Sequence, residues 1–360
     1  MDAPFIALFF FGSVAALAFT LLSRAKHLRD AGLLGSSVLF CLGILETSAY
    51  YTSKPHLVIT DTTPRYWRED AASLGPLPLP ATATRFKEFL DGQLISSVTY
   101  VIDRNRLREI PPSVQGRPYK VAFFGCSFMF GHGVENDQTL PYYFIKAAKG
   151  TSEGFNFAGE GWGPHQMLRA IETGFVRRVA GVPDLAVYEA IPDHLRRVAG
   201  RAPWESGPRY CLCAGNQVCY AGPVHGIYYR TLHYWLDKSW IMRFVENYFP
   251  GFSRPSDIPL FLAVLNKSRR LLAANRTHFV IVMWDQNELG KTIVRTLREN
   301  RFDVIGISSI IDGAGENNIP LTQLDGHPSA AANKAIASYL WEQVGETIAE
   351  SHHSLCEWDH

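Results

Sequence analysis

A serine between glycines is the first residue of this sequence that could carry chemistry. Ser127 stands in the segment Phe124-Gly-Cys-Ser-Phe-Met-Phe-Gly-His-Gly133, directly after a short apolar run. At a strand-to-loop turn a serine can expose its hydroxyl, and glycine backbone can direct amide N–H groups to the same point. Because a serine hydroxyl is a weak nucleophile, this interpretation requires a base nearby. The alternative is a serine that only caps a turn.

A candidate base stands far along the chain, in Leu324-Asp-Gly-His-Pro-Ser329. Side chains at positions i and i+2 of an extended segment point to the same side, so we expect Asp325 and His327 to be neighbours. The carboxylate would then orient the imidazole ring for proton transfer. An isolated Asp-x-His is a weak signal, but this one precedes an Ala-rich segment that is predicted to form the closing helix.

A third glycine-rich segment lies between these two, in Asn156-Phe-Ala-Gly-Glu-Gly-Trp-Gly-Pro-His-Gln166. Its glycines permit a close backbone approach, so an amide N–H here, that of Gly161 in particular, could be a second donor to an oxyanion. The alternative is an ordinary strand-to-helix turn, where glycine is common.

The segments around these motifs alternate between short apolar runs and helical patterns. We expect strands at 120–125, 155–158, 184–191, 277–284 and 302–307, and helices at 138–149, 165–179, 259–274, 289–300 and 330–349. This alternation predicts a three-layer α/β/α domain with a parallel sheet over residues 119–350. Ligands of such sheets bind beyond the carboxyl ends of the strands, where the three motifs stand.

Together, the three motifs resemble the signature blocks of SGNH (GDSL-like) hydrolases, in the family's order. Gly125 to Val134 is similar to the first block, Asn156 to Gln166 to the second, and Asp325 to Ser329 to the last. The resemblance implies an SGNH, flavodoxin-like fold and a triad of Ser127, Asp325 and His327, with Gly161 in the oxyanion hole. Similar membrane-anchored members are polysaccharide O-acetyl esterases or acetyltransferases, which implies an acetylated cell-surface glycan as substrate.

Two positions depart from the family's pattern. Cys126 precedes the serine where the family usually has Asp. The family's third block contributes an Asn to the oxyanion hole, whereas here the third strand leads into Pro-Asp193-His194. His194 could donate a hydrogen bond as Asn would, and an ionised Asp193 could not. Loss of one oxyanion donor costs about 100- to 1000-fold in rate, so the changes weaken the expectation of a fast hydrolase.

Residues 1–52 are predicted to form a membrane anchor of two transmembrane helices. The run 5–22 has no charge and is just long enough to cross a bilayer, and a second apolar run, 31–51, is interrupted only by Glu46. The basic residues between the runs favour a cytoplasmic turn and a periplasmic or extracellular domain. Alternatively only the first run spans, which would place the domain in the cytoplasm. The acidic start of the chain argues against a cleavable signal peptide.

Three further segments flank or interrupt the α/β domain. Residues 53–118 are proline-rich and are predicted to be a connector with short strands, one of them at 94–103. Residues 196–256 form an aromatic-rich insertion, either a lid or sugar-binding surface or simply packed core, and 351–360 form a tail. The insertion holds Cys211, Cys213 and Cys219, too few and wrongly spaced for a typical zinc site, so we expect no metal and, if the domain lies outside the cytoplasm, one disulfide here.

The composition limits the function in one respect. With a net charge of +1 the chain has no electrostatic footprint for nucleic acid. We therefore expect a membrane-bound serine esterase or O-acyltransferase that acts on a small-molecule or glycan ester without a cofactor. The rival hypothesis is a non-catalytic binding or assembly protein on the same scaffold, which Cys126 and the missing Asn would accommodate. Catalysis requires Ser127 and His327 within hydrogen-bond reach.

Overall fold

The structure is a computed structural model and divides into two compact units. The residues it describes are 4–53, 58–70, 74–90, 92–112, 116, 119–200, 207–223, 238–248, 255–308, 310 and 326–356. The first unit comprises Met1–Val58, Leu90–Gly92 and His225–Phe252, and the second comprises Ile59–Phe89, Gln93–Val224 and Ser253–His360.

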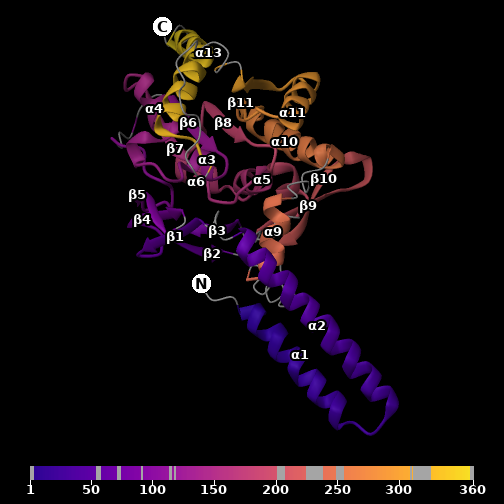
Figure 1. The fold of residues 1–360 in the computed structure, drawn as a ribbon. Helices are drawn as coiled ribbons and strands as arrows, with labels where there is room; N and C mark the ends of the chain where they lie inside the picture. The colour runs from indigo at the N-terminus through magenta and orange to yellow at the C-terminus, as the bar shows by residue number, and fades with distance from the viewer. Residues whose placement is uncertain are drawn as a thin grey trace. The chain divides into compact units, whose positions relative to one another are not determined.

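The first unit is built on two antiparallel helices, α1 (Pro4–Leu22) and α2 (Lys26–Ser53), which form a hairpin (Figure 1). The hydroxyl of Ser13 donates to the Ser36 carbonyl at 2.9 Å, and that of Ser36 donates to the Ser13 carbonyl at 3.0 Å, so polar groups are satisfied where the helices meet. The outward faces are apolar and exposed, as at Phe11 and Leu34. Both helices are long and apolar enough to cross a membrane.

Glu46, the one acidic residue in the second apolar run, is a helix cap. Its carboxylate accepts hydrogen bonds from the backbone amides of Trp240 and Ile241, at 2.6 and 3.1 Å, at the start of α9 (Trp240–Tyr248). Amide groups at a helix start have no partner within the helix and favour a negative charge. The Trp240 ring also meets the edge of Tyr50, with centroids 4.9 Å apart. Part of the predicted insertion therefore packs on α2.

The second unit contains a parallel five-stranded sheet, as the sequence predicts. The strand order is β12-β11-β8-β6-β7, and every pairing is parallel. The strands are β6 (Tyr119–Phe124), β7 (Ser152–Asn156), β8 (Leu185–Ala190), β11 (His278–Met283) and β12 (Asp303–Gly306). All residues of the central strand β8 are buried, which explains its largely apolar sequence, interrupted by Glu189.

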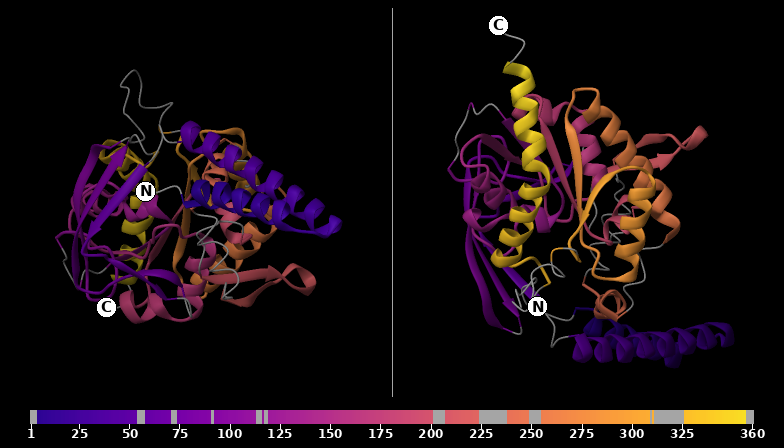
Figure 2. Two further views of the ribbon diagram at one scale, coloured as in Figure 1. Left: turned by 60° about the horizontal axis from the view of Figure 1, so that its bottom comes forward. Right: turned by 90° about the horizontal axis from the view of Figure 1, so that it is seen from above.

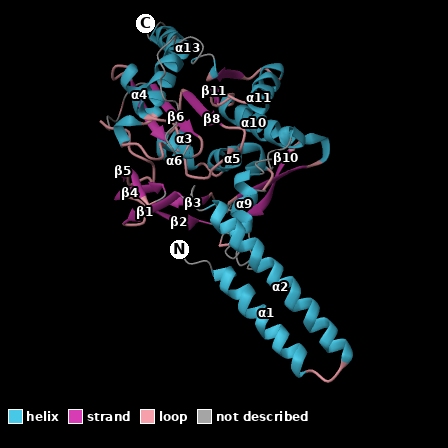
Figure 3. Ribbon diagram, in the orientation of Figure 1, coloured by secondary structure: helices cyan, strands magenta, loops and turns pink. Residues whose placement is uncertain are grey.

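Helices cover both faces of this sheet and give three layers (Figures 2 and 3). One face packs against α5 (Pro164–Glu172), α10 (Ile258–Ala273) and α11 (Glu288–Glu299), and the other against α4 (Leu140–Ala147) and α13 (Ala330–Cys356). Side-chain caps start two of the helices: Thr139 accepts from the Tyr142 amide, and Asn287 accepts from the Gly290 amide. The α/β/α fold class is therefore confirmed.

The predicted helix at 165–179 is broken. It consists of α5 and a separate α6 (Phe175–Ala180), because Gly174 between them adopts a left-handed conformation with φ of 70°. A shorter helix, α7 (His194–Val198), follows β8. The helix interruption was missed because a glycine inside an apolar-periodic run is compatible with a continuous helix.

The segment predicted to be a connector is richer in strands than expected. The predicted strand at 94–103 corresponds to β5 (Gln93–Ile102), which belongs to a three-stranded sheet of order β1-β4-β5. Its other strands are β1 (Val58–Thr63) and β4 (Thr82–Leu90), and a separate antiparallel hairpin pairs β2 (Trp67–Asp70) with β3 (Gly75–Pro78).

The cysteine-rich loop forms a β-hairpin of β9 (Pro208–Leu212) and β10 (Val218–Pro223), drawn in Figure 3 as a pair of strands. A disulfide joins Cys213 to Cys219 across it, as expected for this loop. Cys211 remains a free thiol and is exposed.

Candidate active site

Ser127 stands at the carboxyl end of β6, a strand inside the sheet. Gly125 follows the strand, Cys126 caps the helix start, and Ser127 is the first residue of the one-turn helix α3 (Ser127–Phe130). A β-carbon on Gly125 would lie only 2.8 Å from the Met129 β-carbon and 3.1 Å from the Glu189 carbonyl oxygen. The turn therefore needs glycine at this position, and it directs the serine away from the sheet.

The structure brings Ser127 and His327 together. The Nε2 atom of His327 lies 2.8 Å from the Ser127 hydroxyl oxygen, within the range of a hydrogen bond. His327 follows Gly326, whose φ of 87° is left-handed, and it precedes the first turn of α13. Asp325 lies outside the described residues, so its role as the third member of a triad stays a prediction.

A cavity of about 440 Å³ opens over this pair. Gly161, whose φ is 74°, lines it together with Gly159 and the guanidinium-bearing Arg197. One side of its wall comes from residues before the α/β domain: Tyr66, Trp67, Pro76 and Pro78. The β2–β3 hairpin, which the sequence analysis assigned to a connector, thus supplies one wall of the site.

His194 does not line this cavity. It is completely buried, and its Nδ1 lies 2.6 Å from the Tyr188 hydroxyl. Burial lowers the pKa of His194 well below 6.5, and the charge of Arg197 and the ring of His165 act in the same direction. The ring is therefore neutral, and the structure places it among core residues instead of beside Ser127.

Arg197 lies in the cavity wall, which was not predicted from the sequence. It comes from α7, and its guanidinium is fixed by two hydrogen bonds: Nε donates to Asp193 at 2.7 Å and an NH2 group donates to the Trp162 carbonyl at 2.7 Å. The signal that could have indicated it is the Asp193/Arg197 spacing of four residues, which joins side chains on one helix face. Asp193 thus acts as the anchor of a cation in the cavity wall.

Cys126, the other departure from the family pattern, is a core residue. It is fully buried within the apolar cluster that also holds Phe123 and Met129. Burial is the main reason that its pKa is raised above the ordinary value of 9.0. A protonated thiol in this position contributes packing volume and no nucleophile.

A second histidine, His132, also lies in the cavity wall. Its Nδ1 is 2.7 Å from a carboxylate oxygen of Glu160, and its Nε2 is 3.2 Å from one of Glu88. Burial opposes the charge on this ring, but the charge and hydrogen bond of Glu160, together with Glu88, outweigh it and raise the pKa of His132 to about 10. The imidazolium stacks on the ring of His327, with centroids 4.2 Å apart and planes inclined by 27°.

This cluster was not predicted from the sequence. His132 and Glu160 each stand between two glycines in the first and second blocks, which was a usable signal. Glu88 comes from the middle of β4, and nothing in its local sequence connects it with the blocks.

A buried carboxyl group lies behind the nucleophile turn. The indole of Trp284 donates to Glu189 at 2.6 Å, and Glu189 is completely buried at the end of β8. Burial raises its pKa to about 7, against a smaller opposite effect of the Trp284 hydrogen bond. The Trp284 ring meets the edge of Phe128, which in turn contacts His327 with centroids 5.2 Å apart.

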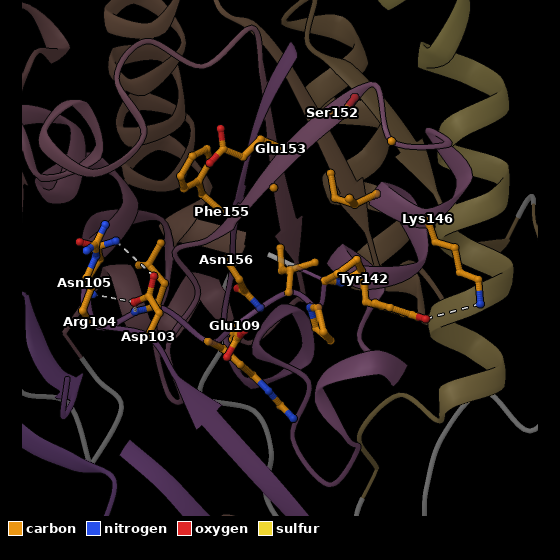
Figure 4. A pocket seen from close by; sticks show the side chains of 18 residues that line it. Asp103, Arg104, Asn105, Glu109, Tyr142, Lys146, Ser152, Glu153, Phe155 and Asn156 are labelled. Carbon is orange, nitrogen blue, oxygen red and sulfur yellow. Dashed lines mark hydrogen bonds between the residues drawn. The ribbon is translucent and has the colours of Figure 1, made fainter. Parts of the chain in front are cut away.

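A second cavity, of about 520 Å³, lies against the edge strand β7 (Figure 4). Its polar side chains pair with their own neighbours: Asn105 donates to Asp103, and Lys146 donates to Tyr142. No histidine occurs among the described residues that line it, and charges of both signs are present. The pairing of a serine with a histidine is therefore a feature of the first cavity.

No family model and no curated protein matches this chain. Solved structures do: a lipolytic protein of the G-D-S-L family from Veillonella parvula DSM 2008 is 13% identical, with a TM-score of 0.38, over 63% of this chain and 97% of that one. A putative lipolytic protein of that family from Desulfitobacterium hafniense DCB-2 is 10% identical over 61% and 97%, with a TM-score of 0.38.

A putative arylesterase from Agrobacterium tumefaciens str. C58 is 12% identical, with a TM-score of 0.37, over 63% of this chain and 99% of that one. Likeness at this level carries no information on activity, which has to be argued from the geometry around Ser127. The structural neighbours of this chain are hydrolases of the GDSL (SGNH) lipolytic type, the family that its three sequence blocks resemble.

Proposed function

We propose that this protein is a serine ester hydrolase whose nucleophile is Ser127 and whose base is His327. The observation that carries the proposal is the 2.8 Å contact between His327 Nε2 and the Ser127 hydroxyl at the wall of a cavity. The contact joins two segments that are distant in sequence, and it has the geometry that general-base activation of a serine requires.

The reaction follows from this arrangement. His327 takes the Ser127 proton as the hydroxyl oxygen attacks the ester carbonyl carbon, and the carbonyl oxygen becomes an oxyanion. The backbone amides of Ser127 and Gly161, both residues of the cavity wall, are the proposed donors to that oxyanion. His327 then gives its proton to the leaving alcohol, and a second acceptor, activated by the same ring, releases the acyl group from Ser127. Asp325 is the proposed partner of His327.

The substrate proposed is an O-acetyl ester on a cell-surface glycan. The wall formed by Trp67 and the two prolines of β3 offers apolar and aromatic surface to a sugar, and the positively charged Arg197 lines the same cavity. With water as acceptor the enzyme is an esterase. With a sugar hydroxyl as acceptor it is an O-acetyltransferase.

The location proposed is a membrane, with the second unit on the periplasmic or extracellular side. Two observations support it: α1 and α2 are long and apolar enough to span a bilayer, and Arg24, Lys26 and Arg29 lie at or next to the turn between them. The Cys213–Cys219 disulfide agrees with an oxidising compartment.

The decisive experiment is labelling of the full-length protein in detergent with a fluorophosphonate probe. We expect wild type to be labelled and Ser127→Ala and His327→Ala to be unlabelled. Ser152→Ala is the matched control, because Ser152 is also buried but lines the cavity without a histidine, so this variant should be labelled like wild type. A folded wild type that resists the probe would favour a binding protein on the same scaffold.

A second measurement identifies the acceptor. An acetylated oligosaccharide is incubated with the protein, with and without an unacetylated oligosaccharide, and the products are separated by mass. Release of free acetate alone indicates an esterase, whereas transfer of acetyl groups to the second sugar indicates a transferase.

A further inference from the structure

We propose that His132, clamped between Glu88 and Glu160, is a positioning residue that holds the ring of His327 against Ser127. This inference rests on the proposed function. It assigns a role to a charged cluster that lies outside the three residues of the predicted triad.

The rings of His132 and His327 are in direct contact. The centroids of His132 and His327 are 4.2 Å apart and their planes are inclined by 27°, so the two rings stack. The edge of Phe86 packs against His132, with centroids 4.7 Å apart. His132 and Glu88 are both buried, so His327 packs on a surface that is fixed from below by core residues.

The contacts of His132 determine its protonation state. A neutral imidazole carries one N–H, whereas His132 has a carboxylate oxygen within hydrogen-bond distance of each ring nitrogen. Both contacts are donated hydrogen bonds only when the ring is an imidazolium. The pKa of Glu160 is lowered because the charge and hydrogen bond of His132 outweigh the effect of burial. One positive ring thus lies between two carboxylates, and the cluster carries an excess negative charge.

Other ionisable groups also face the cluster of His132, Glu88 and Glu160. Tyr66 and Tyr100 pack beside it as neutral phenols, because burial raises the pKa of each well above 10. Arg108 lies over the Tyr100 ring, and its guanidinium bonds to carbonyl oxygens of Phe130, Gly131 and Val134 and to Asn136, so its charge is engaged by the loop. Arg197 lines the same cavity but is paired with Asp193.

The cluster reaches the reacting groups through His132. Its ring packs on that of His327, whose Nε2 lies 2.8 Å from the Ser127 hydroxyl oxygen. Glu160 lies 2.7 Å from Nδ1 of His132 and lines the cavity, whereas Glu88 lies 3.2 Å from the opposite nitrogen and does not line it. Loss of the Glu160 carboxylate should therefore misplace His327 more than loss of the Glu88 carboxylate.

The test compares Glu160→Gln with Glu88→Gln, since each replaces one carboxylate of the cluster by an amide of the same shape. Hydrolysis of p-nitrophenyl acetate is measured from pH 5 to 9 with the full-length protein in detergent. For Glu160→Gln we expect kcat to fall about tenfold with little change in KM. For Glu88→Gln we expect a smaller fall in kcat.

A fall in kcat at unchanged KM and unchanged melting temperature is the part that a purely structural role would not produce. An unchanged kcat in Glu160→Gln, or a loss of activity that follows the loss of folded protein in thermal melts, would overturn the proposal. Fluorophosphonate labelling separates the two levels: labelled wild type with an unchanged kcat in Glu160→Gln refutes only the role of the cluster, whereas unlabelled wild type refutes the proposed function itself.

Discussion

His132 and His194 show how neighbouring groups determine whether a buried imidazole is charged. Both rings are buried, and burial alone favours the neutral form of each. His132 faces two carboxylates and its pKa rises to about 10, whereas His194 faces a phenol and lies near Arg197, and its pKa falls. One therefore serves as a fixed cation and the other as a neutral core residue.

The charge on His132 should make stability depend on pH in the alkaline range. Since the pKa is 6.5 ordinarily and about 10 in the fold, the folded state binds the proton more tightly than the unfolded state between these values. The stabilisation is complete below about pH 6.5 and is lost as the pH rises through 10. We expect wild type to melt well above His132→Gln at pH 6.5 and the difference to narrow by pH 10, in thermal scans monitored by circular dichroism. A constant difference would contradict the ion pair.

Glu189 predicts a pH dependence in the acid-to-neutral range. Its pKa rises from 4.5 to about 7 on folding, so the folded state again binds the proton more tightly, and stability falls as the pH rises from about 4.5 to 7. Glu189→Gln keeps an acceptor for the Trp284 indole and removes the titration. The variant should therefore gain stability relative to wild type between pH 5 and 8, on the order of 3 kcal/mol. Denaturation by urea at both pH values measures this, and equal differences at the two values would contradict it.

The limits of sequence reasoning at this scale are visible in the same residues. That Ser127, His327 and Gly161 lie together could be predicted because each stands in a local pattern that turns or extends the backbone in a known way, and the structure places all three at one cavity. His194 was predicted as an oxyanion donor because it stands near the place of the family's Asn, but the structure buries its ring in the core. Glu88 and Trp67 could not be found, since only the tertiary fold brings β4 and the β2–β3 hairpin to the other residues.

Among the elements, the loop that follows α3 depends on one buried cation. Arg108 is completely buried, and it donates to three carbonyl oxygens between residues 130 and 134 and to the side chain of Asn136. This loop carries His132 at its centre. A planar guanidinium with five donors can satisfy several carbonyls at once, which no other side chain matches.

Replacement of Arg108 should therefore unfold this element first. Arg108→Met keeps much of the volume but leaves the carbonyl oxygens buried without donors, at about 1–3 kcal/mol for each group. We expect a fall in melting temperature and faster hydrogen exchange over residues 130–136. Arg108→Lys retains the charge with fewer donors and should lie between the two. If Arg108→Met melts like wild type, the loop does not depend on these hydrogen bonds.

The sheet and its order of elements could be predicted because apolar strands alternate with amphipathic helices along the chain. For the segment before it, short strands were predicted, but their pairing into a three-stranded sheet and a hairpin could not be, because the prolines there argue mainly against long helices. Pro76 and Pro78 are tolerated in β3, which within the described residues pairs with β2 alone. The break between α5 and α6 was likewise set by the conformation of Gly174.

At the scale of the whole molecule, Glu46 connects the helix α2 with the helix α9, which is distant in sequence. A carboxylate in an apolar helix is costly within a bilayer, but this one is bonded to the amides that begin α9. Glu46 is therefore the position at which the apolar helix α2 contacts polar groups, the backbone amides of α9. We expect Glu46→Ala to leave the hairpin intact and to expose α9, because loss of a cap costs about 1 kcal/mol or more.

Hydrogen exchange of the detergent-solubilised protein checks this directly. Amides of residues 240–248 should exchange faster in Glu46→Ala, while those of α1 and α2 stay protected. Glu46→Gln keeps an oxygen acceptor and should have a smaller effect. Equal exchange in all three proteins would mean that the carboxylate is not what holds α9 to α2.

The cysteines offer a test of which side of the membrane the second unit occupies. Cys211 is exposed and free, whereas Cys213 and Cys219 are joined in a disulfide, so Cys211 is the thiol of this hairpin that can react without reductant. In a Cys41→Ser, Cys356→Ser background, a membrane-impermeant maleimide applied to intact cells should label the protein, and Cys211→Ser should abolish that labelling. Because Cys126 is buried, it should not contribute.

Reductant supplies the second arm of the experiment. Opening the disulfide makes two further thiols available, so reduced cells should incorporate additional label if the hairpin is outside the cytoplasm. Labelling that appears only after lysis would place the hairpin inside, and a single span through α1 would then be the simplest topology. That result would also remove cell-surface glycans from the accessible substrates while leaving the chemistry of Ser127 and His327 unchanged, because the 2.8 Å contact between them does not depend on the anchor.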